Sequence, residues 1–201
     1  TNTITNTNTN TNTTSTPPNE NPKDRVASSP SPSPLDRSRL YLYADYKLIC
    51  LTLMEVALAL RYLHSMQVVH CDLKPGNVLL KSSPNDPRDF TTKLSDFGYV
   101  TLLAGEGPDG HPHALPRRAC GTMAYMAPET FVKGPLLDSS IDVYAFGVLM
   151  WEIVMGLRPY RGITNIATHV IHGGRPVFPP EVPTPYRLLA TACWSADPWA
   201  R

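Results

Sequence analysis

The chain has 201 residues, enough for one domain with a tail, and its 18 basic side chains nearly balance 17 acidic ones. Because nucleic-acid binding needs a basic excess, this balance argues against a nucleic-acid partner. The four cysteines form no C-x-x-C pair, so neither a structural zinc site nor a disulfide framework is expected. Scattered reduced thiols suit the cytoplasm.

The first part of the chain is expected to be disordered. Thr and Asn dominate residues 1–16, and Pro and Ser become frequent over residues 17–34. Such a segment buries too little apolar surface to offset the entropy lost on ordering its backbone. We therefore assign 1–38 to a tail and 39–201 to the folded domain. The functional alternative for the tail is a docking segment controlled by phosphorylation at Ser-Pro.

Apolar residues at helical spacing predict a helix over residues 51–64, with one stripe facing the core. The most apolar run, residues 48–60, contains Glu55 and is too short to cross a bilayer core of ~30 Å. No signal peptide opens the chain. We therefore expect no membrane segment in this chain, and a cytoplasmic location, or the cytoplasmic side of a membrane if upstream sequence carries a span.

Short β-type runs flank the polar loop that follows this helix. Residues 68–69 precede the loop, residues 78–80 follow it, and residues 93–95 should pair with the second run. Residues 81–91, which carry two prolines, should form an unusually long hairpin connection.

The C-terminal third is predicted to be helical. A helix over residues 142–153 is apolar around most of its circumference, so it should be buried, and Ser139 or Ser140 can cap it. Shorter helical patterns follow near residues 165–172 and 185–194. The expected fold is mainly α with short β hairpins.

The polar loop, residues 70–77, reads HCDLKPGN. Its acid, lysine and asparagine have the spacing used in phosphoryl transfer, in which the acid orients the attacking hydroxyl, the lysine neutralises charge and the asparagine holds magnesium. A second acid opens the Asp-Phe-Gly of residues 96–98, and Ala-Pro-Glu follows at residues 127–129. In this order, the motifs resemble the protein kinase family, specifically its C-terminal lobe, over roughly residues 40–201.

The resemblance implies ATP and Mg²⁺ as cofactors and a protein as substrate. It assigns Asp72 and Lys74 to catalysis, and Asn77 and Asp96 to metal binding. Lys74, Asn77 and Leu79 would bind ATP, with Leu79 beneath the adenine. Each motif alone could be an ordinary turn, but together at matching offsets they favour the functional interpretation.

Further positions match family residues with structural or activation-segment roles: His70, Phe97, Gly98, Thr122, Glu129, Asp142 and Arg201. By resemblance, His70 and Phe97 belong to a stack that links two lobes, and Thr122 contacts the catalytic acid and lysine. Glu129 should pair with Arg201. Asp142 should accept backbone N–H bonds from the catalytic loop.

The type of kinase is indicated by local sequence. Lys74-Pro75 and Thr122 resemble the serine/threonine class, and residues 121–129 with the Cys-Trp…Asp-Pro of residues 193–198 resemble its tyrosine-kinase-like branch.

Cys71 stands where kinases switched by activation-loop phosphorylation carry an arginine that pairs with the phosphate. A thiol cannot make this pair, so we predict that the usual switch is absent. Between Asp96 and Gly121, moreover, the only Ser or Thr is Thr101. An inert packed thiol is favoured over a redox sensor.

No glycine-rich loop and no Val-Ala-x-Lys strand precede residue 70. The N-terminal lobe is therefore expected to be absent and the domain truncated at its end. Three interpretations remain: the C-lobe portion of a serine/threonine kinase, a non-catalytic C-lobe that binds proteins, and a relic. The intact polar motif residues favour the first.

Overall fold

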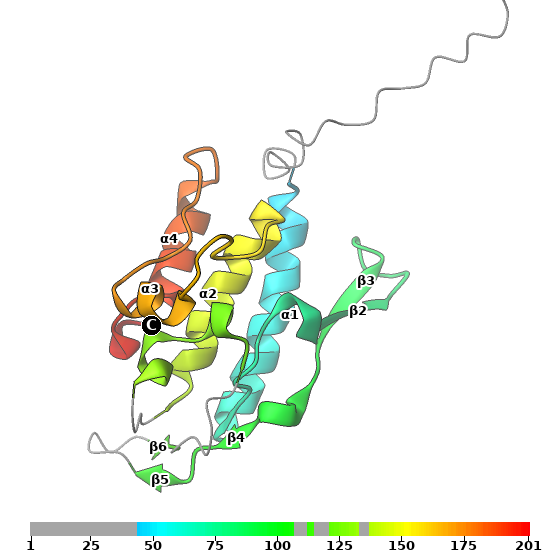
Figure 1. Cartoon of the computed structure of the whole chain (residues 1–201). Helices are drawn as coiled ribbons and strands as arrows, with labels where there is room; N and C mark the ends of the chain where they lie inside the picture. The colour runs from blue at the N-terminus through cyan, green and yellow to red at the C-terminus, as the bar shows by residue number, and fades with distance from the viewer. Residues whose placement is uncertain (1–43, 107–111, 115–120, 133–136) are drawn as a thin grey trace, which may run out of the picture. The chain divides into compact units, whose positions relative to one another are not determined.

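The computed structural model describes residues 44–106, 112–114, 121–132 and 137–201. The tail predicted over residues 1–38 lies outside these described residues, as does Cys120. The described part consists of helices with a few short strands (Figure 1).

Helix α1 (Tyr46–Ser65) begins earlier than the helix predicted over residues 51–64. Its N-cap is Asp45, whose carboxylate accepts hydrogen bonds from the backbone N–H groups of Lys47 (3.0 Å) and Leu48 (3.2 Å). This cap satisfies donors of the first turn, which extends the helix beyond the apolar stripe. The stripe faces the core through three buried side chains: Leu53, Val56 and Leu60.

The length of α1 corrects one part of the sequence argument. The helix has 20 residues and is long and apolar enough to cross a membrane by length and composition alone. The shortness of the run at residues 48–60 therefore no longer argues against a span. These two criteria are weak evidence, because a core helix can also satisfy them. The buried stripe of α1 is part of the same core as α2.

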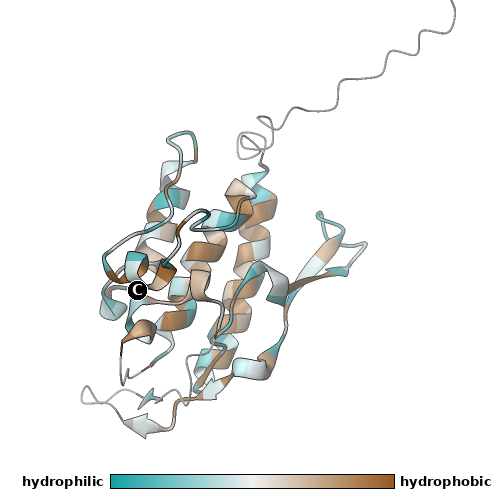
Figure 2. Ribbon diagram, in the orientation of Figure 1, coloured by the Kyte–Doolittle hydropathy of each residue, from teal (hydrophilic) through white to brown (hydrophobic). Residues whose placement is uncertain are grey.

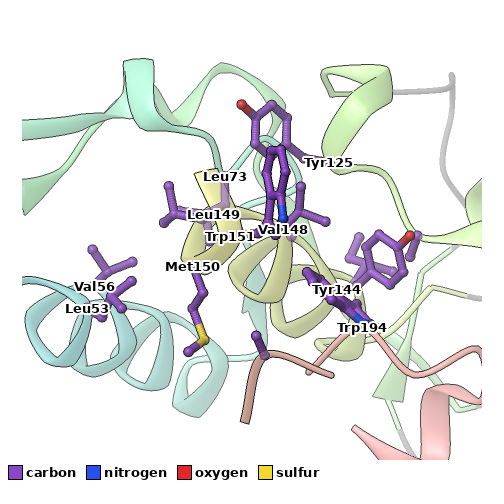
Figure 3. Close-up of a cluster of buried hydrophobic side chains, with 14 of the residues drawn as sticks. Leu53, Val56, Leu73, Tyr125, Tyr144, Val148, Leu149, Met150, Trp151 and Trp194 are labelled. Atoms are coloured by element: carbon purple, nitrogen blue, oxygen red, sulfur yellow. The ribbon is translucent and has the colours of Figure 1, made fainter. Parts of the chain in front are cut away.

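Helix α2 (Ser140–Met155) is the centre of the core, and α1 and α4 (Thr184–Cys193) lie on either side of it (Figure 1). As predicted for residues 142–153, its side chains are buried around most of its circumference. Apolar residues dominate it (Figure 2). Figure 3 shows residues from other elements gathered around it, including Leu73, Tyr125 and Trp194.

Gly147 permits the close approach of α2 and α4. A Cβ at this position would lie 2.9 Å from the backbone oxygen of Ala190 and 2.9 Å from the Cβ of Cys193. Only a residue without a side chain fits this contact. Helix α3 (Ile166–Ile171) is capped by Asn165, and both α3 and α4 agree with the shorter helices predicted from the sequence.

The strands form two-stranded antiparallel pairs. β1 (Val68–Val69) pairs with β4 (Thr101–Leu102), and β5 (Gly105–Glu106) pairs with β6 (Pro112–His113).

The longest pair is the hairpin of β2 (Val78–Ser82) and β3 (Phe90–Leu94). Its connection is residues 83–89, shorter than the predicted 81–91, because Lys81 and Ser82 continue β2 and pair with Thr91 and Phe90 of β3.

Candidate active site

The loop of residues 70–77 is held by the first turn of α2. The carboxylate of Asp142 accepts hydrogen bonds from the backbone N–H groups of His70 (2.8 Å) and Cys71 (2.9 Å). The same carboxylate lies 2.9 Å from Nε2 of His64, at the end of α1. Asp142 is 1% exposed, so one buried carboxylate joins the loop, α1 and α2. The two backbone contacts are those that the resemblance implied.

Four polar side chains converge within this loop and the segment that follows Gly121. Nζ of Lys74 lies 2.6 Å from Oδ2 of Asp72, and the hydroxyl of Thr122 donates to Oδ1 of Asp72 at 2.8 Å. Lys74 also donates to Oγ1 of Thr122 at 3.0 Å. The amide Nδ2 of Asn77 donates to Oδ2 of Asp72 (3.1 Å) and to its backbone oxygen (2.8 Å).

These contacts determine the charge state of Asp72. Burial by itself would raise the pKa of this carboxyl, but hydrogen bonds from Lys74, Thr122 and Asn77 outweigh burial and hold the pKa below its ordinary value. The carboxylate is therefore ionised at neutral pH. Such a weak base is suited to accepting a hydrogen bond from a hydroxyl and orienting it.

Asp96 lies next to this cluster through the β2–β3 hairpin. The backbone N–H and the hydroxyl of Ser95 both donate to the backbone oxygen of Asn77, at 2.9 and 3.0 Å. Asp96 follows directly, in a left-handed conformation (φ +61°) that starts a 3₁₀ turn at Phe97–Tyr99. The structure thus brings Asp72, Asn77 and Asp96 to one end of the hairpin.

Asn77 and Asp96 fit a magnesium ion that retains water and phosphate ligands. Both hydrogen bonds of the Asn77 side chain use Nδ2, so its Oδ1 is not engaged by them. The carboxylate of Asp96 is exposed and accepts one bond, from Gly98 N–H at 3.3 Å. Oxygen ligands of this kind suit Mg²⁺. Within the described ranges, no group of three or more His, Cys, Asp or Glu could hold a metal.

His70 and Phe97 pack against each other. His70 is fully buried, its Nε2 lies 3.0 Å from the backbone oxygen of Ser95, and its ring meets that of Phe97 edge-on at 5.6 Å. The other ring nitrogen, Nδ1, accepts a hydrogen bond from the backbone N–H of Asp72 at 3.3 Å. Because both ring nitrogens have partners, His70 has a structural role in the loop. Leu79, on β2, is 53% exposed.

Glu129 and Arg201 form the pair that the resemblance implied. Two guanidinium nitrogens of Arg201 lie 2.6 and 2.9 Å from the two carboxylate oxygens of Glu129. The side chain of Arg201 is fully buried, and its guanidinium stacks on the ring of Tyr144 at 5.1 Å. This two-pronged ion pair connects the Ala-Pro-Glu segment to the end of the described chain.

Cys71 adopts a left-handed backbone conformation (φ +67°) in the loop. Gly121 crosses close to it, since a Cβ on Gly121 would lie 2.5 Å from the backbone oxygen of Cys71. The thiol is half-buried and lies 3.7 Å from the backbone oxygen of Val69. This environment agrees with a packed thiol.

Two contacts near the site were not predicted. The hydroxyl of Tyr125 donates to the carboxylate of Glu152 on α2, and burial raises the pKa of both groups. Apart from Asp142 at its first position, Glu152 is the one charged residue in the helix predicted over residues 142–153, and this was a usable signal. The contact of His64 with Asp142 had no such signal, because it joins residues 78 positions apart.

The fold consists of helices with a few short strands, and its polar cluster has the residue types used in phosphoryl transfer. Together they define a kinase-like domain. The family model for the protein kinase domain matches residues 41–201. The chain therefore belongs to the protein kinase family.

Curated relatives carry names of the same kind. Two probable LIM domain-containing serine/threonine-protein kinases of Dictyostelium discoideum are 39% and 38% identical, each over 73% of this chain and over 14% and 21% of their own lengths. A putative serine/threonine-protein kinase/receptor of Acanthamoeba polyphaga mimivirus is 30% identical over 77% of this chain and 9% of its own length. The chain thus spans about a fifth or less of these relatives.

Proposed function

We propose that this chain carries the catalytic loop, activation segment and C-terminal lobe of a serine/threonine kinase that transfers the γ-phosphate of ATP to a protein hydroxyl. The observation that carries the proposal is the hydrogen-bonded cluster of Asp72, Lys74, Asn77 and Thr122 beside Asp96. The names of the relatives support the serine/threonine class. The tyrosine-kinase-like branch rests on the sequences of residues 121–129 and 193–198.

Each side chain has a role that follows from its surroundings. Asp72 accepts the hydrogen bond of the substrate hydroxyl and aligns it, while the ammonium of Lys74 neutralises charge on the group being transferred. Oδ1 of Asn77 and the carboxylate of Asp96 would hold Mg²⁺, which neutralises charge on the phosphates when bound. Thr122 fixes the orientation of Asp72 and Lys74 relative to each other.

The exposed apolar surface near the site supports a partner lobe supplied by residues outside this chain. Leu79, Phe97 and Tyr99 are 53%, 54% and 49% exposed. Exposed large apolar side chains close to an active site favour an interaction surface there. The three glycines of residues 105–110 have the spacing of a phosphate loop, but they follow Asp96 in the chain, whereas the family's glycine-rich loop precedes the catalytic loop.

The experiment measures phosphate transfer from γ-labelled ATP to a mixed protein substrate, with phosphoamino-acid analysis of the product. In the longest protein that contains this chain, we expect labelled Ser and Thr. Asp72→Asn should lower the rate at least ~100-fold, since it removes the group that orients the hydroxyl. Asp45→Asn, which keeps a helix cap outside the site, is the control. Labelled tyrosine alone, or an Asp72→Asn protein as active as the control, would refute the proposal.

The same exposed surface also favours a second candidate, a non-catalytic C-lobe that binds a protein. Under this alternative, even the longest protein that contains this chain transfers no phosphate. Phe97→Glu should then abolish the stable complex with the bound protein. Transfer that depends on Asp72 decides against it.

A further inference from the structure

The β2–β3 hairpin is incompletely packed on the rest of the domain. Val78, Leu80 and Phe90 line an open cavity of about 360 Å³, whose other walls come from α1 and α2, including Leu149 and Ile153. Leu80 is also 59% exposed. Because an isolated two-stranded hairpin is only marginally stable in water, this loose apolar contact is a weak support.

Arg88, in the hairpin connection, supplies a second attachment. Its side chain is only 3% exposed. Nε and Nη2 donate to the two carboxylate oxygens of Asp86, both at 2.8 Å, which fixes the guanidinium plane. Nη2 lies 2.8 Å from Oε2 of Glu55 on α1, and Nη1 donates to the hydroxyl of Thr52 at 3.1 Å. The guanidinium also stacks on Phe90 at 5.0 Å.

Glu55 extends this attachment into strand β3. Its Oε2 accepts the backbone N–H of Thr92 at 2.9 Å, so one carboxylate of α1 holds both the connection and the strand. Hydrogen bonds from Arg88 hold the pKa of Asp86 at about 2. For Glu55, hydrogen bonds from Thr92 and Arg88 outweigh burial and lower the pKa. All three groups are therefore charged at neutral pH.

The candidate metal ligands lie at the opposite, open end of the hairpin. Val78 pairs with Leu94 in the last step of the ladder, and the next residues, Asn77 and Ser95, are joined by the two hydrogen bonds from Ser95. Asp96 follows. The separation of Asn77 from Asp96 is thus set by the same ladder that Arg88 and Glu55 attach to α1.

We propose that Arg88 is a positioning residue. It clamps the hairpin to α1 through Glu55, and this attachment fixes the placement of Asn77 relative to Asp96. This rests on the proposed function, in which those two side chains hold the metal–nucleotide. The clamp lies beside the cavity, where apolar packing of the hairpin is loose. Because the ladder opens as one local unit, release at the turn reaches Ser95, which follows its last pair.

Amide hydrogen exchange measured by NMR tests the clamp without requiring activity. In Arg88→Met, which keeps an apolar stem, we expect exchange at Thr92 and Ser95 to become at least tenfold faster, with Val148 in the core unchanged. Arg187→Met removes a comparable arginine from α4 and is the matched control, because its bonds go to Val182 and Thr184. Faster exchange at Thr92 with Ser95 unchanged means a purely local role and overturns the proposal.

A second variant covers failure of the first to fold. Glu55→Gln keeps size and a hydrogen-bond acceptor, and should speed exchange at Ser95 at least threefold. If Arg88 and Glu55 act as one clamp, Glu55→Gln should add little when Arg88 is already methionine. If the increases in the exchange rate at Ser95 multiply in the variant that carries both Arg88→Met and Glu55→Gln, the two residues act independently and the clamp is contradicted.

Paramagnetic broadening by Mn²⁺ with ATP connects the clamp to the site. In Arg88→Met, the Mn·ATP concentration that lowers the intensity of the Gly98 amide signal by half should rise at least fivefold. In Arg187→Met this concentration should not change. An unchanged concentration in Arg88→Met overturns the positioning role. If the longest protein that contains this chain, without substitutions, shows no broadening, the proposed function fails, while exchange at Ser95 still decides whether the clamp exists.

Discussion

The core around α2 and the β2–β3 hairpin are stabilised by different interactions. Around α2, apolar side chains from several elements fill the interior, and Val148 and Leu149 are fully buried (Figure 3). Beneath the hairpin lies a cavity, and a charged clamp makes the attachment. The β2–β3 hairpin, which leads to Asn77 and Asp96, is thus attached to the domain largely through a few polar bonds. Such regions open locally at lower free energy than cores.

The comparison predicts its largest effect at Trp151 on α2. Trp151→Ala should lower the free energy of unfolding by about 3–5 kcal/mol, because it empties a large core volume. It also removes the bond from the indole N–H to the backbone oxygen of Val177. Urea denaturation measures the change. Leu80→Ala, in the hairpin, is the control and should change stability by no more than about 0.5 kcal/mol. Equal effects at both sites would contradict the comparison.

Glu129→Ala should be the next most destabilising change. It leaves the fully buried guanidinium of Arg201 without its carboxylate, which costs about 3 kcal/mol, at the lower end of the range for broken buried ion pairs. Chemical denaturation of Glu129→Ala and Glu129→Gln distinguishes the causes. The glutamine variant keeps an acceptor and should lose less. If both variants match the unaltered protein, the pair has no structural role.

Gly147→Ala tests the tightness of the α2–α4 contact. The added methyl would meet backbone of Ala190 and Trp194 at 2.9 and 3.1 Å, so the helices must separate. Overpacking of this kind costs about 1–3 kcal/mol. The melting temperature should fall, while Gly105→Ala, where the new methyl would lie at an ordinary contact distance of 3.5 Å from the backbone oxygen of His113, serves as the control. An unchanged melting temperature for Gly147→Ala would show that the contact is loose.

The pH dependence of stability should show the smallest effect. Because the pKa of Asp72 is lowered in the folded state, its contribution to stability is fully present above its unfolded pKa of about 3.9. That contribution is lost as the pH falls through the folded pKa. The free energy of unfolding of Asp72→Asn should therefore decline less below about pH 4 than that of the unaltered protein. Parallel declines would mean that Asp72 is unpaired in solution.

Much of this domain follows from local sequence, because local patterns determine it. The all-round apolar composition of α2 predicts a buried helix, and the order of acid, lysine and asparagine predicts a cluster. The start of α1 was misplaced because its first turn depends on the Asp45 cap rather than on apolar spacing.

The clamp could not be predicted from local patterns. Arg88 meets Thr52 across 36 positions of sequence, in a connection that looks like an ordinary polar loop. Only the folded chain reveals which of several charges is buried there. The contact of Tyr125 with Glu152 is similar, although a charged residue near the end of an apolar helix pointed to Glu152.

The convergence of Asn77 and Asp96 on one metal–phosphate centre is tested most directly by an NMR titration of the longest protein that contains this chain with Mn²⁺ and ATP. The side-chain amide of Asn77 and the backbone amide of Gly98 should broaden at the same Mn·ATP concentration, and Asp96→Asn should abolish both effects together. Broadening of one signal without the other, or broadening of Asn77 that survives Asp96→Asn, would contradict the shared centre.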